Sequence, residues 1–458
     1  MRWLIFSKQI FKQLRNVSLW QTLQTAGISI ILIMMLFPYP SRFISYVMGF
    51  CLGFALVHRL LLPPQKGVNA VFRYALPYLV LYGVLLVSCF FSVNVSASLS
   101  YCGRYFCLWL IPLVFIGMTP SFFTVRRLRI FAFCLVVGAV IGVLWKFYSL
   151  YQVCFSNRLD VYREQGWGIC ARYIYGYNQY RYFFKALGCA LEHPAFEALF
   201  ELMALVVVLR AWIKRDVFFS HGYGKVLAVF AIGIIIINLL LFCTKAAALG
   251  CVLSVFALWV YALCKKRYIF VGTSAVGVLL CMGVLTFRSP EMIFSRYNQT
   301  IQASKNFLKG RSTEEDASFI PRIHTYRIGW EMFKERPLTG WGVFYTKEFG
   351  KRYEEYSDNT IVEYLGEKKI LKHPHNQLIM VLDVCGIVGG MVLVWLFVCI
   401  LRDVWHRKSL FWWIWFASLL TICAIDVIFN RTIGYICLCG FHGVLFCELV
   451  SDSSRLEA

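Results

Sequence analysis

The chain has 458 residues, of which 59 % are hydrophobic and only 15 % are charged. A soluble domain of this size cannot bury so much apolar surface, whereas a lipid bilayer can accept it. The formal net charge of +22 is of the size found in nucleic-acid-binding proteins, but the Lys and Arg residues lie mainly at the ends of apolar runs. That distribution is typical of membrane proteins, in which basic residues flank the transmembrane helices on the cytoplasmic side. The composition therefore predicts a polytopic membrane protein with membrane lipids around it and no nucleic-acid partner.

Apolar runs of the ~20 residues that a helix needs to cross a bilayer recur along the chain. They predict an all-α fold with about twelve transmembrane helices, near residues 18–37, 43–63, 73–92, 101–119, 128–150, 193–213, 224–243, 245–264, 268–287, 376–401, 409–429 and 432–450. Residues 151–192, rich in Tyr and Arg, and the long polar stretch 288–375 interrupt these runs. We expect three parts: residues 1–287 with helices one to nine and the 151–192 loop, the large loop 288–375, and residues 376–458 with the last three helices and a tail.

The Lys and Arg residues also predict which side of the membrane each loop faces. The N-terminal segment and every second connection between apolar runs are basic, whereas the other connections are short and nearly uncharged. Positive loops stay in the cytoplasm, so we expect both long loops outside and both chain ends inside. Lys245 and Arg431 are exceptions at outer turns. An ionisable group at the membrane edge is a functional candidate, although the Lys245 side chain has the alternative of reaching lipid headgroups.

The large loop 288–375 carries side chains that suit chemistry on an anionic substrate. Basic and aromatic residues stand in two of its segments, Arg296 after the ninth apolar run and then Arg322, Tyr326 and Arg327. Apolar residues recur at helical spacing after Arg322, which predicts a helix that Pro337 ends. His373, His375 and Asn376 lie where the loop returns to the membrane.

The run around His375 carries a resemblance to a known family. His375-Asn376 is followed by nine residues and then by Gly386-Ile387-Val388-Gly389. This run resembles the bacterial O-antigen ligases, whose pattern is His, then Asn, Ser or Gln, nine residues, Gly, two residues, and Gly, Thr or Tyr. Other segments resemble the family in the same order along roughly residues 240–435: Thr244-Lys245-Ala246 with Lys at the usual Arg position, SRYNQ around Arg296, Arg322-x-x-x-Tyr326 with Pro337-x-x-Gly340, and IDVIFNR ending at Arg431.

The resemblance implies a glycosyltransferase of the GT-C-like class in the bacterial cell inner membrane, acting in lipopolysaccharide biosynthesis. Such an enzyme transfers a glycan from undecaprenyl diphosphate to a sugar hydroxyl of the lipid A–core acceptor in the periplasm, without a metal or other cofactor. Imidazole is a suitable base at neutral pH, so His375 and Arg322 are the expected catalytic residues. Cationic and polar neighbours are expected to bind the diphosphate and the glycans: Lys245, Asn376, Arg296, Arg327, Tyr326 and Arg431.

Several of these assignments have a structural alternative. His373 competes with His375 as the base, and only the spacing of His375 fits the family pattern. Asn376 is as consistent with a helix N-cap as with a substrate ligand. The alternative role for Arg322 is an ion pair with Glu314, Glu315 or Asp316. Exposed ion pairs of this kind contribute little to stability.

Three further features stay open in the sequence. His193, Glu197 and Glu201 share one helix face, and polar lining suits them better than a metal site. Asp383 and Asp426 lie deeper in apolar runs, as buried polar partners or as part of a proton route. Cys154 and Cys170 both belong to the 151–192 loop, and a disulfide between them would persist outside the cytoplasm.

Two other functions remain as alternatives to ligation. An O-antigen polymerase would use the same chemistry with a second lipid-linked glycan as acceptor. A flippase or transporter for the lipid-linked glycan belongs to another class, which commonly shows internal repeats and broken helices in two halves. The chain shows no repeat and has one dominant outer loop, so the transferase is favoured.

Overall fold

The computed structural model describes part of the chain. The described residues are 17–34, 46–51, 53, 68–117, 122–155, 194–214, 222–241, 245–264, 266–268, 271–272, 275–276, 301–302, 305–306, 309, 320–356, 363–364, 367–368, 371–430 and 432–456. These residues are almost entirely helical, as the apolar runs predict. Their strands are β1 (Glu363–Tyr364) and β2 (Glu367–Lys368), which pair antiparallel.

Most described apolar helices lie on the predicted runs, whereas the predicted runs 43–63 and 268–287 lie largely outside the described residues. Those of the first part are α2 (Val17–Met34), α4 (Val68–Ser88), α5 (Val95–Cys102), α6 (Cys107–Gly117), α7 (Val125–Phe155), α11 (Pro194–Lys214), α12 (Gly222–Leu241) and α13 (Lys245–Cys264). The large loop contains α16 (Ile320–Glu335) and α17 (Thr346–Tyr356). The last part contains α18 (Gln377–Arg407), α19 (Leu410–Ile425), α20 (Thr432–Tyr435), a π-helical turn (Ile436–Gly440) and α21 (Phe441–Leu456).

Four helical segments of the described residues are long and apolar enough to cross a membrane. They are Phe72–Phe91, Val95–Ile116, Arg126–Trp145 and Gln377–Arg407, and five shorter apolar helices accompany them. The chain is therefore a helical membrane protein, as the composition predicts. The expected number of about twelve spans and the side that the large loop faces stay predictions.

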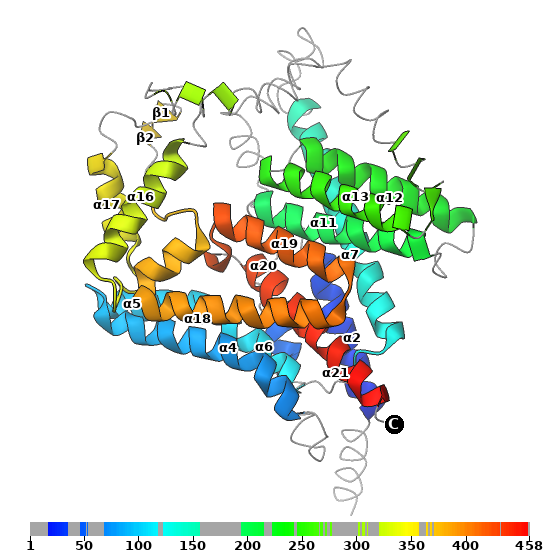
Figure 1. Cartoon of the computed structure of the whole chain (residues 1–458), viewed down its shortest axis with the longest axis horizontal. Coiled ribbons are helices and arrows are strands. Elements are labelled where there is room, and N and C mark those ends of the chain that lie inside the picture. Colours follow the sequence, from blue (N-terminus) through cyan, green and yellow to red (C-terminus); the bar gives the residue numbers. More distant parts are fainter. Residues whose placement is uncertain are drawn as a thin grey trace, which may run out of the picture.

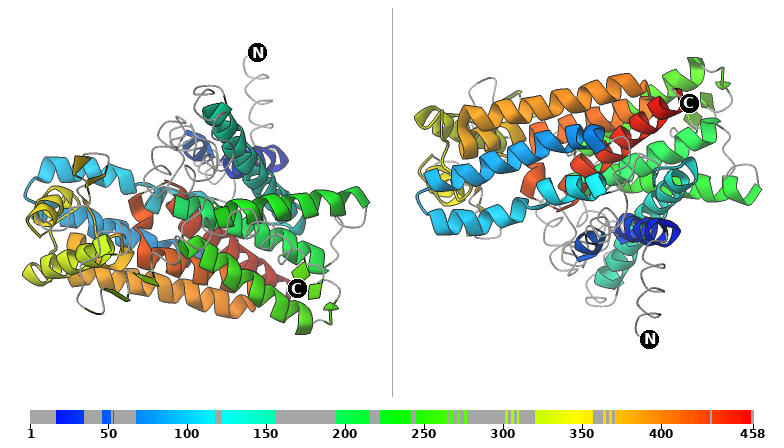
Figure 2. Two further views of the ribbon diagram at one scale, coloured as in Figure 1. Left: turned by 90° about the horizontal axis from the view of Figure 1, so that it is seen from above. Right: turned by 90° about the horizontal axis from the view of Figure 1, so that it is seen from below.

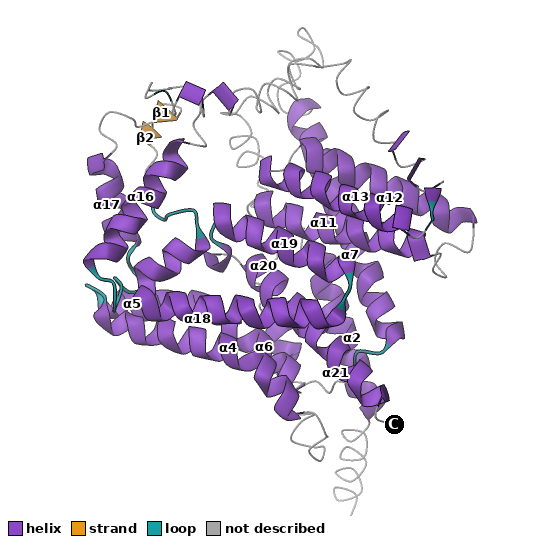
Figure 3. Ribbon diagram, viewed as in Figure 1, coloured by secondary structure: helices purple, strands orange, loops and turns teal. Residues whose placement is uncertain are grey.

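The long helix α18 organises the described part. It packs against α4, α19, α16 and α21, so it contacts helices that are far apart in the sequence. Figure 1 shows α16 and α17 at one end of α18 and the C-terminal end of α21 near the other. Figure 2 shows the same helices from above and below, with α4 and α18 side by side, and Figure 3 shows how little of the described chain lies outside helices.

A break inside α18 fixes α16 to it. Gly386 has φ 64° and ψ −161°, which interrupts the helical hydrogen bonds. The segment that follows α16 inserts there: the N–H of Trp341 donates to the carbonyl of Asp383 (2.7 Å), and the N–H of Ile387 donates to the carbonyl of Pro337 (2.7 Å). A Cβ atom at Gly386 would collide with the backbone of Leu338. The Gly and Pro residues of the two motifs therefore meet as backbone partners, which satisfies the polar groups that a broken membrane helix leaves open.

Candidate functional site

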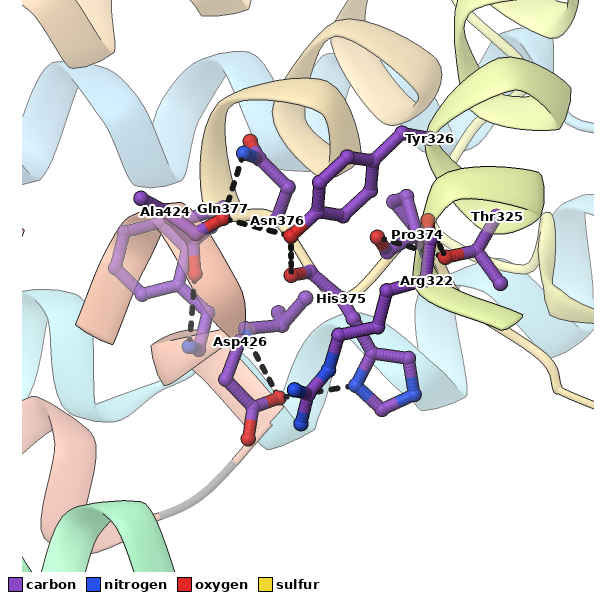
Figure 4. Close-up of polar contacts among 11 residues, drawn as sticks. Arg322, Thr325, Tyr326, Pro374, His375, Asn376, Gln377, Ala424 and Asp426 are labelled. Atoms are coloured by element: carbon purple, nitrogen blue, oxygen red, sulfur yellow. Dashed lines mark hydrogen bonds and ion pairs between the residues drawn. The ribbon is translucent and has the colours of Figure 1, made fainter. Parts of the chain in front are cut away.

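The candidate site lies where α16, the start of α18 and the end of α19 meet (Figure 4). His375 comes directly before α18. Asn376 is the N-cap of that helix, because its Oδ1 accepts from the N–H of Ile379 (3.0 Å). The other end of the same amide, Nδ2, donates to the carbonyl of Ala424 (3.0 Å). The capping alternative for Asn376 is thus observed, and this amide ties the start of α18 to the end of α19.

Tyr326 holds the same loop from the side of α16. Its hydroxyl oxygen lies 2.9 Å from the carbonyl oxygen of Ala424 and 3.3 Å from that of His375. One residue earlier on α16, Thr325 is fully buried and its hydroxyl oxygen lies 3.2 Å from the carbonyl oxygen of Pro374. These contacts, drawn in Figure 4, fix the backbone on both sides of the His375 ring.

His375 is paired with a carboxylate. Its Nδ1 lies 3.4 Å from Oδ1 of Asp426, and the two side chains are 17 % and 7 % exposed. Asp426 follows α19, and its Oδ1 also accepts from the N–H of Val427 (2.8 Å). A buried carboxylate beside Nδ1 orients an imidazole and stabilises its charged form. The pair can therefore act as a base of defined orientation.

Arg322 brings a guanidinium group to this pair. It lies on α16, one turn before Tyr326, and Figure 4 shows its guanidinium directed toward the His375 ring and Asp426. Within the described part of the chain, no hydrogen bond or ion pair involves this guanidinium. Burial raises the pKa of the Tyr326 hydroxyl, the nearby Arg322 lowers it, and Asp426 raises it, so both charges act on one hydroxyl. The arrangement combines a base, its carboxylate and a cation.

His373 lies beside His375 in the same site. The two ring centroids are 4.1 Å apart, with planes tilted by 49°. The sequence pattern separates these residues by spacing alone, but the fold brings their rings into contact. His373 therefore lies next to the His375 ring and lines one side of the candidate site.

The remaining predicted site residues fall into two groups. Arg327 is exposed, and its Nε donates to Glu331 (3.1 Å) one turn along α16. Lys245 is the first residue of α13, but its side chain, Arg296 and Arg431 lie outside the described residues, as do Glu314, Glu315 and Asp316. The structure thus brings together Arg322, Tyr326, His375 and Asn376.

One other candidate polar residue, Glu201, links two helices through a buried hydrogen bond. Glu201 is fully buried in α11 and accepts from the amide of Asn238 on α12 (2.5 Å). Among the described residues no group of three or more His, Cys, Asp or Glu side chains could hold a metal. His193, the Glu197 side chain and the proposed Cys154–Cys170 bridge lie outside the described residues.

Asp426 contacts His375 although the sequence alone does not pair the two residues. The sequence is consistent with a buried polar partner or a proton route, and the separation of 51 residues along the chain predicts no contact. The signal was the position of Asp426: a lone carboxylate at the outer end of the eleventh apolar run, in a segment that resembles the family.

The comparison with protein families fits this geometry. Residues 227–394 match the model of the O-antigen ligase family. This region belongs to the O-antigen ligase family. The O-antigen ligase region contains Arg322, Tyr326, His375 and Asn376 together with the break at Gly386. A comparison with curated proteins finds no match.

The family match indicates a general kind of activity for the matched region. The family consists of glycosyltransferase-like membrane enzymes of lipopolysaccharide biosynthesis, which act as O-antigen ligases or polymerases. A lipid-linked glycan and lipid A–core are the substrates that the family implies in general. The match ends at residue 394, so Asp426 enters the site from outside the matched region.

Proposed function

We propose that the protein is an O-antigen ligase of the bacterial inner membrane. It transfers a glycan from undecaprenyl diphosphate to a sugar hydroxyl of lipid A–core on the periplasmic side. The observation that carries the proposal is the buried contact between His375 and Asp426 (3.4 Å) beside the Arg322 guanidinium. A base next to a cation is what an attack by a hydroxyl on a sugar phosphate requires.

His375 acts as the general base in this proposal. The acceptor oxygen forms a bond to the anomeric carbon of the donor, its proton passes to Nε2 of His375, and the bond from that carbon to the diphosphate oxygen breaks. Asp426 accepts from Nδ1–H and stabilises the imidazolium that forms. In this proposal Nδ1–H points to Asp426, whose Oδ1 lies 3.4 Å from Nδ1, and Nε2 is unprotonated before attack.

Arg322 stabilises the leaving diphosphate. Negative charge grows on that group as the bond breaks, and a planar guanidinium fork binds phosphate oxygens through two charge-assisted hydrogen bonds. Lys245, Arg296 and Arg431 are proposed as further cations around the diphosphate, which would let the reaction proceed without a metal. Tyr326 and Asn376 act mainly by holding the His375 loop, through their bonds to the Ala424 carbonyl.

The position of the base suits a lipid-linked donor. His375 stands directly before α18, one of the helices long and apolar enough to cross the membrane. A residue at the mouth of a span reaches the interface where the diphosphate of a polyprenyl donor lies, with its chain in the hydrocarbon. The same geometry would serve a polymerase, whose acceptor is a second lipid-linked glycan.

Glycolipids from a strain that lacks the gene test the proposal. Loss of a ligase leaves long glycan on the lipid carrier and lipid A–core without glycan. Complementation with the wild-type chain restores the capped product, whereas the His375→Ala variant, present in the membrane at equal amount, does not. Lipid A–core that carries a single repeat unit in the deletion strain would instead show a polymerase, and lipid-linked units retained inside the cell would show a flippase.

A further inference from the structure

A cavity lies at the opposite end of α18 from the candidate site. Its volume is about 580 Å³, and residues of α2, α6, α7, α11, α18, α19 and α21 line it. Most of its walls are apolar, for example Ile31, Ile111, Phe115, Phe441 and Val444. Arg407 comes just before α19, and Asp426, which contacts His375, comes just after it. Because α19 has 16 residues and a helix rises 1.5 Å per residue, the cavity end and His375 are roughly 24 Å apart. The cavity is therefore separate from the transfer site.

Charged side chains from four helices enter this apolar cavity. They are Arg129 of α7, Arg210 of α11, Arg407 of α18 and Glu448 of α21. The Nε of Arg407 donates to Oε2 of Glu448 (2.9 Å), and that oxygen also accepts from the indole N–H of Trp412 (3.2 Å). The lining thus carries three positive charges and one negative charge, and the negative charge is already paired with Arg407.

Arg210 also faces the cavity, and Glu448, the acidic group that acts on it, already pairs with Arg407. The Arg210 guanidinium carbon lies 5.9 Å from the ring centroid of Phe411, and it has no hydrogen bond or ion pair among the residues that the structure describes. A half-buried guanidinium between apolar helices costs free energy unless an anion compensates it. Its surroundings therefore indicate a bound anion.

We propose that this cavity binds one acidic glycerophospholipid. The phosphate accepts from Arg210 through a charge-assisted fork, and the acyl chains lie along the apolar walls. A small soluble anion would leave those apolar walls uncovered. A zwitterionic headgroup would place its own positive group beside three guanidinium groups. Basic pockets between transmembrane helices on the cytoplasmic side bind acidic lipid headgroups, and the orientation expected from the sequence places these arginines on that side.

Lipid binding to the purified full-length protein tests the inference. Delipidated protein in detergent is titrated with phosphatidylglycerol and with phosphatidylcholine of the same acyl chains, and bound lipid is counted by native mass spectrometry. We expect one phosphatidylglycerol per chain, bound at least about tenfold more tightly than phosphatidylcholine. Arg210→Gln is expected to lower phosphatidylglycerol affinity about tenfold and to leave phosphatidylcholine unchanged. Ala132→Trp, which fills the cavity from α7, lowers the binding of both.

Arg126→Gln is the matched control. Arg126 is exposed on the same end of α7 but does not line the cavity, so its loss should leave phosphatidylglycerol affinity unchanged. Arg210→Lys, which keeps the charge, covers the case in which Arg210→Gln does not fold, and should retain most of the affinity. Equal affinity for the two headgroups, equal losses in Arg210→Gln and Arg126→Gln, or no effect of Ala132→Trp would overturn the site. Tighter binding of undecaprenyl phosphate than of phosphatidylglycerol would overturn the assigned occupant.

Discussion

His375 has a backbone φ of 49°, in the left-handed region that residues other than Gly rarely occupy. Such a conformation costs of order 1–3 kcal/mol and persists only where the surroundings enforce it. Here they do: the Asn376 cap follows it, Tyr326 reaches its carbonyl, and the Thr325 hydroxyl lies against the preceding carbonyl. The strained residue is therefore held by three bonds from two helices, and its ring is presented in a fixed direction.

Asp426→Asn tests the role of the carboxylate at this scale. The amide keeps the shape of the side chain but cannot accept from Nδ1–H in the same way, so the imidazole loses its preferred tautomer. We expect turnover to fall tenfold or more with little change in KM, measured with purified protein, lipid-linked donor and lipid A–core. The double variant with His375→Ala should be no slower than His375→Ala alone, because the two residues act as a unit. Additive losses would contradict the pair.

Arg322→Lys tests the guanidinium fork. A point charge replaces two directed donors, so we expect turnover to fall roughly tenfold while the protein remains folded. Arg327→Lys is the comparison on the same helix, where the exposed side chain pairs with Glu331 instead. It should lose much less. If Arg327→Lys is the more impaired of the two, the diphosphate is bound on the other face of α16.

At the scale of elements, the break in α18 decides where the site stands. In an unbroken helix the carbonyl groups of this region would be paired within the helix. None would be available to accept from the segment that follows α16. The break instead presents the carbonyls of Asp383 and Val384 to the N–H groups of Trp341 and Gly342. The packing of α16 on α18, and so the position of Arg322 relative to His375, depends on this insertion.

Gly386→Ala tests the insertion. A Cβ atom there meets the Leu338 carbonyl, and the φ of 64° is unfavourable for Ala, so we expect a loss of about 1–3 kcal/mol of stability and a fall in turnover. Gly83→Ala on α4 is the matched control, because nothing lies within 4 Å of its added Cβ. Thermal unfolding in detergent measures both. Equal melting temperatures for the two variants would show that the break does not constrain the fold.

At the scale of the whole molecule, a row of three buried, hydrogen-bonded side chains joins helices that are far apart in sequence. The hydroxyl of Tyr78 on α4 lies 2.8 Å from Nδ1 of His442 on α21, and Nε2 of His442 lies 3.0 Å from Oδ2 of Asp403 on α18. All three side chains are almost fully buried. Each of these polar atoms is surrounded by apolar side chains and needs its hydrogen-bond partner. The three side chains therefore fix the register of α4, α18 and α21.

His442→Ala is expected to destabilise the helix arrangement rather than the chemistry. Asp403 and Tyr78 would each lose a buried partner, at a cost of roughly 3 kcal/mol. The melting temperature should fall, and the KM for either substrate should stay as in the wild type at a temperature where the variant is folded. A changed KM with unchanged melting temperature would give His442 a role in substrate binding instead.

The sequence predicts some of these features and not others, for physical reasons. Hydrophobic runs report burial in a bilayer, so most of the apolar helices lie on predicted runs, and α16 followed from its helical spacing. The polar helix α17 has no apolar run and was not predicted. His375 and Arg322 stood out because their chemistry matches the reaction and the family pattern. The contact with Asp426 did not, since periodicity gives no distance between side chains from different helices. The break at Gly386 was equally hidden, because the apolar pattern of α18 continues through it.

In the proposed reaction, His375 removes the proton of the acceptor hydroxyl. The most direct test of this step is the single-turnover rate of the purified His375→Ala variant with lipid-linked donor and lipid A–core, beside His406→Ala, which changes an exposed histidine at the far end of α18. We predict a loss of roughly a hundredfold or more for His375→Ala, with wild-type donor affinity and melting temperature, and an unchanged rate for His406→Ala. A His375→Ala variant that ligates at the wild-type rate would contradict the account.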